Sequence, residues 1–315
     1  MTRIFFATDV HGSEKCFGKF LNAWKFYKSS VIILGGDLTG KVIVPIIDNG
    51  AGLFTCNFLG SSYEMHSENE VQTFEKNLRF SGYYPFRTDK QNLEALNASK
   101  DKQDELFTRL MDDTLKRWIT QAEEKLKPNK IRMYVTGGND DKFEIEPILK
   151  SSDYVIDAEG EVVRLDDDHE MISSGYSNIT PWSCPRDITE EELEVKIAAM
   201  ADRVENMQNC IFNLHCPPYD SGLDTAPELD KNLKPVFRSG QLSQIPVGSK
   251  AVRSALEKYK PLLGLHGHIH ESRGEAEVGR TLCLNPGSEY TEGILRGVIL
   301  DLDKNRIKSW QFTSG

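Results

Sequence analysis

Paired cysteines, an excess of basic charge and long apolar runs are all missing from this 315-residue sequence. Its six cysteines are scattered and none forms a Cys-x-x-Cys pair, so we expect a reducing compartment and no disulfide framework. A formal net charge of −10 makes long nucleic acid an unfavoured partner, because proteins that follow polyanions usually present a basic face. No apolar segment approaches the roughly 20 residues that span a bilayer, and no signal peptide fits the start of the sequence. We therefore expect a cytoplasmic protein without a membrane partner.

Short apolar segments that stop at glycine or at a polar residue predict buried strands. Two of them, at 3–8 and 31–34, flank a helical pattern that Ser13 can cap, and this order is typical of a βαβ unit with parallel strands. Further strands are expected at 131–136, 154–157, 161–165, 170–174, 210–214, 262–265, 281–284 and 294–302, and helices at 190–206 and 249–259. The pattern predicts an α/β fold whose functional loops follow the carboxyl ends of the strands.

The region from about residue 41 to residue 130 departs from this alternation. Segments 41–47 and 52–58 predict a hairpin, whereas 64–80 and 101–126 predict helices. The apolar stripe of the second helix is best explained by packing. No repeat or flexible linker interrupts the chain, so we predict one domain over residues 1–315 with an elaborated insertion at about 41–130.

Polar side chains gather directly after the predicted strands. They are Asp9, His11, Asp37, Asn139, His215, His268 and His270. One histidine at a strand end usually serves packing, but recurrence at five strand ends makes coincidence a poor explanation. Carboxylate, imidazole and amide oxygen are ligands expected for Mn, Fe or Zn rather than for a thiolate zinc site. Seven ligands are too many for one tetrahedral ion, so we expect two divalent or trivalent transition-metal ions that share a bridging carboxylate.

The histidine-rich segment at 266–270 suggests how two ligands reach one pocket. In an extended chain, residues two apart point the same way, so His268 and His270 are expected to face the site while Ile269 turns into the core. The same argument places Asp9 and His11 on one face. A packed or supporting role is expected for the remaining histidines, which are His66, His169 and His266.

These motifs, taken together and in this order, resemble those of the calcineurin-like metallophosphoesterases. The matching pieces are DVH at 9–11, GD at 36–37, GN at 138–139, a lone His215 and GHIH at 267–270. The stretches LHCPPYDSGLD, VGSKAVR and NPGS look like those of the Icc-like bacterial and archaeal branch. The resemblance spans residues 9 to 270. It implies a four-layer αββα sandwich of two mixed β-sheets, classed as α/β or in some schemes as α+β, with an inserted helical region.

The resemblance also implies a ligand partition and an activity. One metal would be bound by Asp9, His11, Asp37 and His270, and the other by Asp37, Asn139, His215 and His268. The implied enzyme is a dinuclear metal-dependent phosphoesterase that attacks small phosphodiesters or nucleotides with a metal-activated hydroxide. The alternatives are a phosphomonoesterase or protein phosphatase, and a non-catalytic interaction scaffold, against which the complete ligand set argues. The partner would be a small phosphorylated substrate, and the oligomeric state stays open, a homo-oligomer included.

Two features depart from the family pattern. In GGNDD, at 137–141, Asp140 stands where the family usually has a histidine that helps the leaving group. A carboxylic acid is almost wholly ionised at neutral pH, so Asp140 is a poor general acid. It could act in catalysis together with Asn139, or it could orient a ligand or cap the turn. The second departure is the spacing of 102 residues between Asp37 and Asn139, which leaves room for a lid or a partner surface. Basic residues of this region that could meet a substrate phosphate, or simply be solvated, are Lys41, Arg79 and Arg87.

Overall fold

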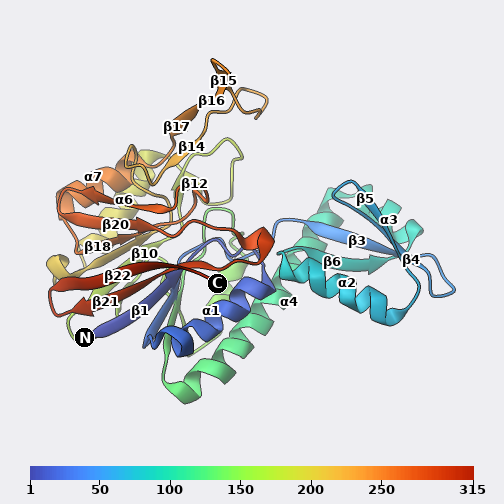
Figure 1. Cartoon of the computed structure of the whole chain (residues 1–315), viewed down its shortest axis with the longest axis horizontal. Coiled ribbons are helices and arrows are strands. Elements are labelled where there is room, and N and C mark those ends of the chain that lie inside the picture. Colours follow the sequence, from blue (N-terminus) through green and yellow to red (C-terminus); the bar gives the residue numbers. More distant parts are fainter.

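The computed structural model describes residues 1–315 and is built around two six-stranded mixed β-sheets (Figure 1). The first sheet has the order β22-β21-β1-β2-β7-β8 and comprises β1 (Thr2–Ala7), β2 (Val31–Leu34), β7 (Arg132–Val135), β8 (Val155–Asp157), β21 (Arg296–Asp303) and β22 (Arg306–Ser314). The second has the order β19-β20-β18-β13-β10-β9 and comprises β9 (Val162–Arg164), β10 (Glu170–Ser174), β13 (Ile211–Leu214), β18 (Leu263–Leu265), β19 (Gly274–Val278) and β20 (Thr281–Asn285). In each sheet four neighbouring strands pair in parallel, and the other two pairings are antiparallel. The predicted α/β class is confirmed.

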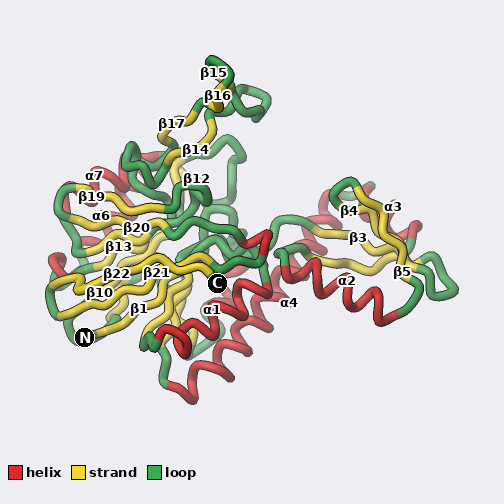
Figure 2. Tube along the Cα trace, viewed as in Figure 1, coloured by secondary structure: helices red, strands yellow, loops and turns green.

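Seven α-helices and three short 3₁₀ turns accompany the sheets (Figure 2). They are α1 (Glu14–Tyr27), α2 (Glu68–Phe80), α3 (Lys90–Asn97), α4 (Lys100–Leu126), α5 (Ile145–Leu149), α6 (Glu190–Ala201), α7 (Lys250–Tyr259), η1 (Lys127–Asn129), η2 (Met207–Asn209) and η3 (Tyr290–Glu292). Ser13 caps α1, and the predicted capping box of Thr189 and Glu192 starts α6, which ends at Ala201 instead of reaching residue 206. No helix is long and apolar enough to cross a membrane.

The buried residues divide into three large clusters that explain why the strands are apolar on both faces. In β1, Phe5 belongs to a cluster with α1 and α4, whereas Phe6 belongs to a cluster between the two sheets. Successive strand residues point to opposite faces, so such a strand must be apolar throughout. The third cluster joins the other face of the second sheet to α6 and α7. Helix α4 is held against α1 by the stacked rings of Phe17 and Trp118, whose centroids are 4.0 Å apart.

The region after β2 forms a separate lobe, on the right in Figure 1. Its four-stranded sheet has the order β5-β4-β3-β6 and comprises β3 (Ile43–Asp48), β4 (Phe54–Phe58), β5 (Ser61–Met65) and β6 (Tyr84–Thr88). A small core of its own includes Val44, Ile46 and Val71. The expected β3–β4 hairpin and the two expected helices are confirmed, but the expectation of a helical insertion was wrong, because a mixed sheet forms half of the lobe. Helix α4 lies outside this core and packs on the first sheet.

Three smaller strand pairs lie beyond the main sheets, two of them in an arm at the top of Figure 1. The pairs are β11 (Ser177–Asn178) with β12 (Asp187–Ile188), β14 (Thr225–Pro227) with β17 (Gln244–Pro246), and β15 (Phe237–Arg238) with β16 (Gln241–Leu242). The segment between β13 and α7 that contains the arm was not predicted to hold strands. β14 and β17 return the chain to the ends of the second sheet, beside the loops that carry the expected ligands.

Candidate metal centre

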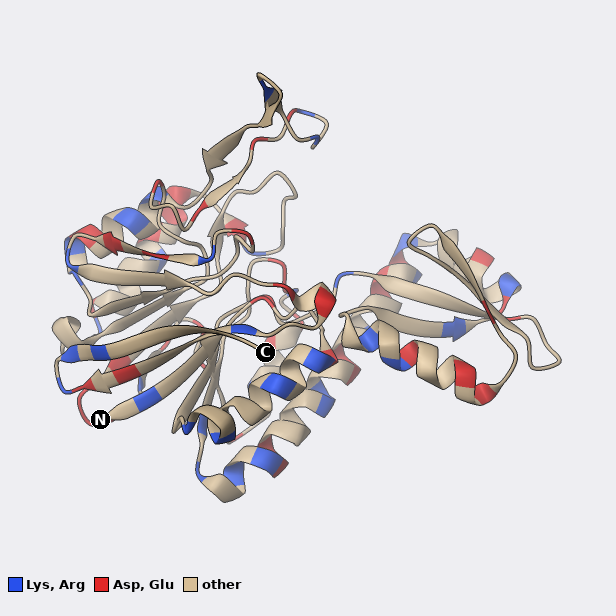
Figure 3. Cartoon of the chain, in the orientation of Figure 1, with Lys and Arg blue, Asp and Glu red and all other residues tan.

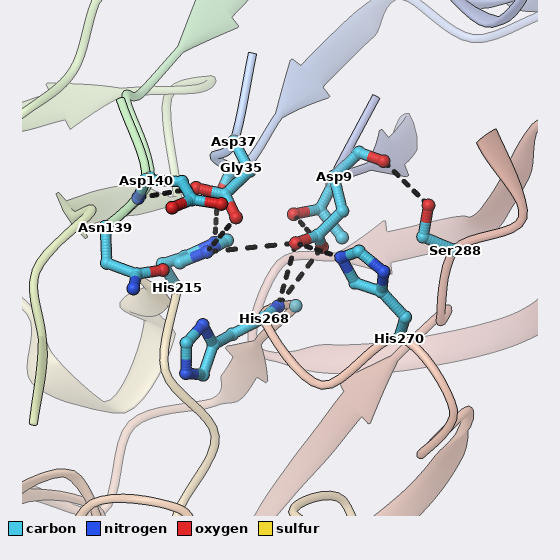
Figure 4. Close-up of polar contacts among 12 residues, drawn as sticks. Asp9, Gly35, Asp37, Asn139, Asp140, His215, His268, His270 and Ser288 are labelled. Carbon is cyan, nitrogen blue, oxygen red and sulfur yellow. Dashed lines mark hydrogen bonds and ion pairs between the residues drawn. The ribbon is translucent and has the colours of Figure 1, made fainter. Parts of the chain in front are cut away.

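The seven expected metal ligands all follow strands at their carboxyl ends. Figure 4 labels all of them except His11 and shows the labelled ones gathered around one site. Asp9 and His11 follow β1, Asp37 follows β2, Asn139 follows β7, His215 follows β13, and His268 and His270 follow β18. Three of these strands belong to the first sheet and two to the second. Two sheets packed face to face thus bring residues that are up to 261 positions apart to one place.

One group of four side chains gathers around Asp9. The ligand-type atoms of Asp9, His11, Asp37 and His270 all lie within 4.8 Å of one another. His270 Nε2 is 3.3 Å from Asp9 Oδ1 and 3.1 Å from His11 Nε2. His11 Nε2 is in turn 3.5 Å from Asp37 Oδ2. Two carboxylates and two imidazoles therefore converge on one point.

A second group shares Asp37 with the first. The ligand-type atoms of Asp37, His215 and His268 lie within 4.8 Å of one another. His215 Nε2 is 3.4 Å from Asp37 Oδ2. Asn139 lies beside His215 (Figure 4), and its side-chain oxygen is buried without a hydrogen-bond partner. Asp37 is thus the carboxylate common to both groups.

The electrostatics of the site favour a bound cation. Burial opposes ionisation of Asp9 and Asp37, which are 1% and 3% exposed, yet the charge of the neighbouring His215 holds the pKa of both carboxyls below the ordinary value. Burial also works against a charged His215, but Asp37 and Asp9 raise its pKa to about 9. For His11 and His268, burial prevails and lowers the pKa to about 4. The pKa of His270, which burial lowers, is likewise raised above its ordinary value by Asp9. Two buried anions are therefore faced by the neutral imidazoles of His11 and His268 and by two histidines of raised pKa.

The donor atoms themselves fit a metal. His215 Nε2 and Asn139 Oδ1 are buried and have no hydrogen-bond partner within the protein. Buried polar atoms are normally hydrogen-bonded, so such orphans indicate a missing ligand. Carboxylate oxygens with imidazole nitrogens form a donor set that suits first-row transition ions. The cluster could therefore hold metal.

The backbone at four of the expected ligands is left-handed. Asp9, His11, Asp37 and His268 have φ values of 53°, 41°, 49° and 68°. Such angles cost a residue with a side chain roughly 1–2 kcal/mol and concentrate at functional sites. The expectation that each pair reaches the site from an extended chain was wrong, because tight turns follow β1 and β18. Ile269 is buried, as expected.

Two glycines of the motifs let the ligands approach the neighbouring chain. A Cβ at Gly138 would collide with the carboxylate of Asp37, and one at Gly267 would collide with that of Asp9. The glycine of GN and the glycine of GHIH are therefore needed for close packing of one ligand loop against the next, which is a physical reason for their place in the motifs.

Several supporting residues were not predicted. The carboxylate of Asp141 accepts backbone hydrogen bonds from Leu38, Thr39 and Gly138, all at 2.8–2.9 Å, and so joins the loops after β2 and β7. Ser288, within the NPGS stretch, donates to the carbonyl of Asp9 at 2.7 Å. The second aspartate of GGNDD and the serine of NPGS were visible in the sequence, but nothing local indicated their partners.

Of the other histidines, His266 and His169 are packed as expected, whereas no packed role is shown for His66. His266 is fully buried and its Nδ1 lies 2.8 Å from the carbonyl oxygen of Leu214, directly before His215. His169 is buried against Asp166 at 2.8 Å. His66 is exposed in the lobe.

Asp140 and Lys41 form an ion pair beside the cluster. The second carboxylate oxygen of Asp140 accepts from Cys184 Sγ at 3.0 Å, and the Asp140 backbone N–H donates to Asp37 at 3.1 Å. Of the three basic residues considered for phosphate, only Lys41 reaches the site. Arg79 and Arg87 both pair with Glu75 in the lobe, at 3.7 and 2.7 Å.

A groove of about 680 Å³ opens beside the cluster. Its polar end is formed by Asp37, Asn139, His268 and His270, together with Lys41. Apolar residues of the loop after β11 and of β14 and β17 form its walls. A ligand bound at the cluster therefore has space for a second, apolar part.

Comparison with known proteins shows a similarity of fold. No family model matches the sequence. The uncharacterized protein MJ1162 of Methanocaldococcus jannaschii is 32% identical over 151 residues, and the match spans 47% of this chain and 61% of the length of that relative. Among solved structures, TT1561 of Thermus thermophilus aligns over 100% of this chain and 98% of its own, with a TM-score of 0.53 and 13% identity. A weaker match, to an archaeal phosphodiesterase, has a TM-score of 0.36 at 13% identity over 99% of both chains. At such identities the likeness concerns the mixed α/β fold alone.

Proposed function

We propose that the protein is a dinuclear metal-dependent phosphoesterase of the calcineurin-like superfamily, Icc-like branch, acting on small phosphodiesters or nucleotides. The observation that carries this proposal is the shared position of Asp37, whose carboxylate belongs to both ligand groups. A single-ion site has no use for a second group of imidazoles around the same carboxylate. A scaffold has no use for four left-handed residues around two buried anions.

We assign one ion to Asp9, His11, Asp37 and His270, and the other to Asp37, Asn139, His215 and His268. Manganese, iron and zinc all suit these donors. When bound, a pair of such ions supplies a water molecule of lowered pKa and positive charge for the phosphate oxygens. The rest of the work belongs to the chain. Left-handed turns aim the ligands, and the hydrogen bond from Ser288 fixes the turn at Asp9.

The protein's own charges also act on the substrate. Lys41 lines the groove beside the cluster and is paired with Asp140. Burial disfavours its charge, but the Asp140 and Asp37 carboxylates raise the pKa of Lys41 above its ordinary value, so it is a cation at neutral pH. We place Lys41 at the entrance for an anionic substrate. Asn139 would act as a ligand, and Asp140 would orient Lys41 without donating a proton.

We further propose that residues 1–315 form one domain with the four-layer αββα sandwich of this superfamily. The three large core clusters support this, since they join helices to the first sheet, the two sheets to each other, and the second sheet to helices. The lobe between β3 and β6 would be the insertion at about 41–130.

The test combines metal content with hydrolysis. Metal-free protein is loaded separately with Mn²⁺, Fe²⁺ or Zn²⁺, and bound metal is measured by elemental analysis. We expect about two ions per chain and metal-dependent hydrolysis of bis(4-nitrophenyl) phosphate that exceeds hydrolysis of 4-nitrophenyl phosphate. A protein that retains no ion is not of this class. A protein with two ions that prefers the monoester is the phosphomonoesterase of the alternative reading.

A further inference from the structure

The groove beside the charged centre is lined in part by large apolar side chains. Ile179 and Trp182 on one side, and Ile245 and Val247 on the other, line it along with Ile269 at its base. Ile179 and Trp182 are 64% and 63% exposed. Large apolar side chains that stay exposed and cluster in a concavity indicate a binding surface.

The loop that carries these two side chains is held in place. Asp187 accepts hydrogen bonds from the backbone N–H groups of Thr180 and Cys184, at 3.0 and 2.9 Å. Asn178 Nδ2 donates to the carbonyl oxygen of Val247 at 3.3 Å, which ties the loop to the opposite wall. Trp182 is therefore presented by a loop fixed at both ends, so the apolar wall exists before any ligand binds.

The charges of the groove limit the ligand to one anionic group. Apart from the expected metal ligands His268 and His270, Lys41 is the only basic residue among those lining it, and it already faces Asp140. Glu271 adds a further negative charge near His270. Elsewhere, as along α1, α2 and α4, basic and acidic residues are interspersed (Figure 3). A second phosphate placed along the groove would meet an apolar wall and a carboxylate instead of a cation.

We propose that this groove binds an ester substituent of a phosphodiester and that Ile179 and Trp182 select substituents with a flat apolar face, such as an aryl group or a nucleoside base. The inference rests on the proposed function, because the phosphate must be held at the metal end. An aromatic substituent stacked on Trp182 removes apolar surface from water on both sides. A small alkyl substituent leaves that surface exposed. The enzyme would then act on diesters that carry one negative charge. It would discriminate poorly among aromatic substituents that differ only in their polar groups.

The test measures the binding of two ligands that share the same methylphosphonate group. Phenyl methylphosphonate and methyl methylphosphonate are both monoanions, and they differ in the substituent alone. Binding to the metal-loaded protein is measured by calorimetry. We expect the phenyl ligand to bind about tenfold more tightly than the methyl ligand, which is the gain typical of one stacked ring. Trp182→Ala should abolish most of this ratio while leaving the metal content and the affinity for the methyl ligand unchanged.

A matched control is Phe26→Ala, which removes a ring that is 80% exposed on α1 and lies outside the groove. This variant should keep the ratio of the wild type. Equal affinities of the wild type for the two ligands would overturn the groove proposal but leave the phosphoesterase intact. Equal weakening of both ligands by Trp182→Ala would also overturn it. Failure to bind metal and either ligand would instead overturn the proposed function.

Discussion

Asp187 accepts a hydrogen bond from the side-chain amide of Asn139 at 3.0 Å. The other oxygen of the same carboxylate holds the loop that carries Trp182, through the N–H groups of Thr180 and Cys184. Because the amide nitrogen of Asn139 is engaged in this way, its oxygen faces the cluster. One carboxylate, 48 residues away in the sequence, therefore orients both a candidate ligand and the wall of the groove.

Replacing Asp187 should weaken the binding of one metal ion more than that of the other. Residues that orient a ligand typically change metal affinity by about 10–100-fold when they are lost. We expect Asp187→Ala to lower Mn²⁺ affinity at one of two sites by that factor, measured by competition with a chelator. Asp167→Ala, at an exposed position, should change neither site. Two unaltered affinities in Asp187→Ala would show that Asn139 is oriented by other contacts or is no ligand.

Removal of the shared carboxylate should do more harm than removal of a terminal ligand. In Asp37→Ala, two cations would lose the anion between them, and their repulsion is strong at short range. We expect Asp37→Ala to lose metal from both sites and nearly all activity, whereas His11→Ala should keep close to one ion per chain. Elemental analysis of the two variants distinguishes them. Retention of two ions by Asp37→Ala would show that Asp37 is no bridge.

The sequence predicted the cluster well because its chemistry is local to strand ends. Asp37 and His215 could each be placed by the apolar strand before them, and packing of the two sheets then brings those strand ends together. Asp187 could not be found in this way, since its partner Asn139 lies in another segment and the loop between β11 and β12 has no periodicity. β5 was missed for a related reason. Its residues Ser61–Met65 are mostly polar and exposed, so no apolar pattern marks the strand.

A further prediction concerns pH and stability. Burial raises the pKa of Glu159 to about 7 from its ordinary 4.5, although hydrogen bonding from Gly175 and the charge of Arg186 oppose this. Between these two values the folded protein holds a proton that the unfolded chain has released. The free energy of unfolding should therefore fall as pH rises through this window and level off above about pH 7. The full change is about 3 kcal/mol at about 1.4 kcal/mol per pH unit.

Glu159→Gln should remove this dependence. Urea unfolding of the wild type and of Glu159→Gln between pH 4.5 and pH 8.5 measures it as a difference, in which the titration of all other groups cancels. The variant should gain stability relative to the wild type as pH rises. The control is Glu161→Gln, two residues along the chain, where the side chain is 61% exposed. Its free energy of unfolding should differ from that of the wild type by the same amount at every pH. A constant difference for Glu159→Gln as well would place its folded pKa near the ordinary value.

The last prediction concerns Asp140, which stands where the calcineurin-like metallophosphoesterases that the motifs resemble usually have a histidine. Its carboxylate is paired with Lys41 and accepts from Cys184, so both oxygens serve as acceptors and neither is set to donate a proton. The leaving group must then depart largely as an anion. A well-placed general acid contributes about 10²–10⁴-fold, and this help is greatest for poor leaving groups. Without it, the rate should fall steeply as the pKa of the leaving alcohol or phenol rises.

A series of methyl aryl phosphates of graded leaving-group pKa, run with metal-loaded protein, tests this directly. We expect a steep decline of kcat/KM along the series for the wild type and the same slope for Asp140→Asn, because neither the ionised carboxylate nor the amide gives a proton to the leaving group. Asp140→His should flatten the slope if its ring can occupy the turn, because an imidazolium there could give a proton to the departing oxygen. A selective loss of tenfold or more on the poorest leaving groups in Asp140→Asn would contradict this assignment. Asp140 would then be the proton donor, and its pairing with Lys41 would have to break when substrate binds.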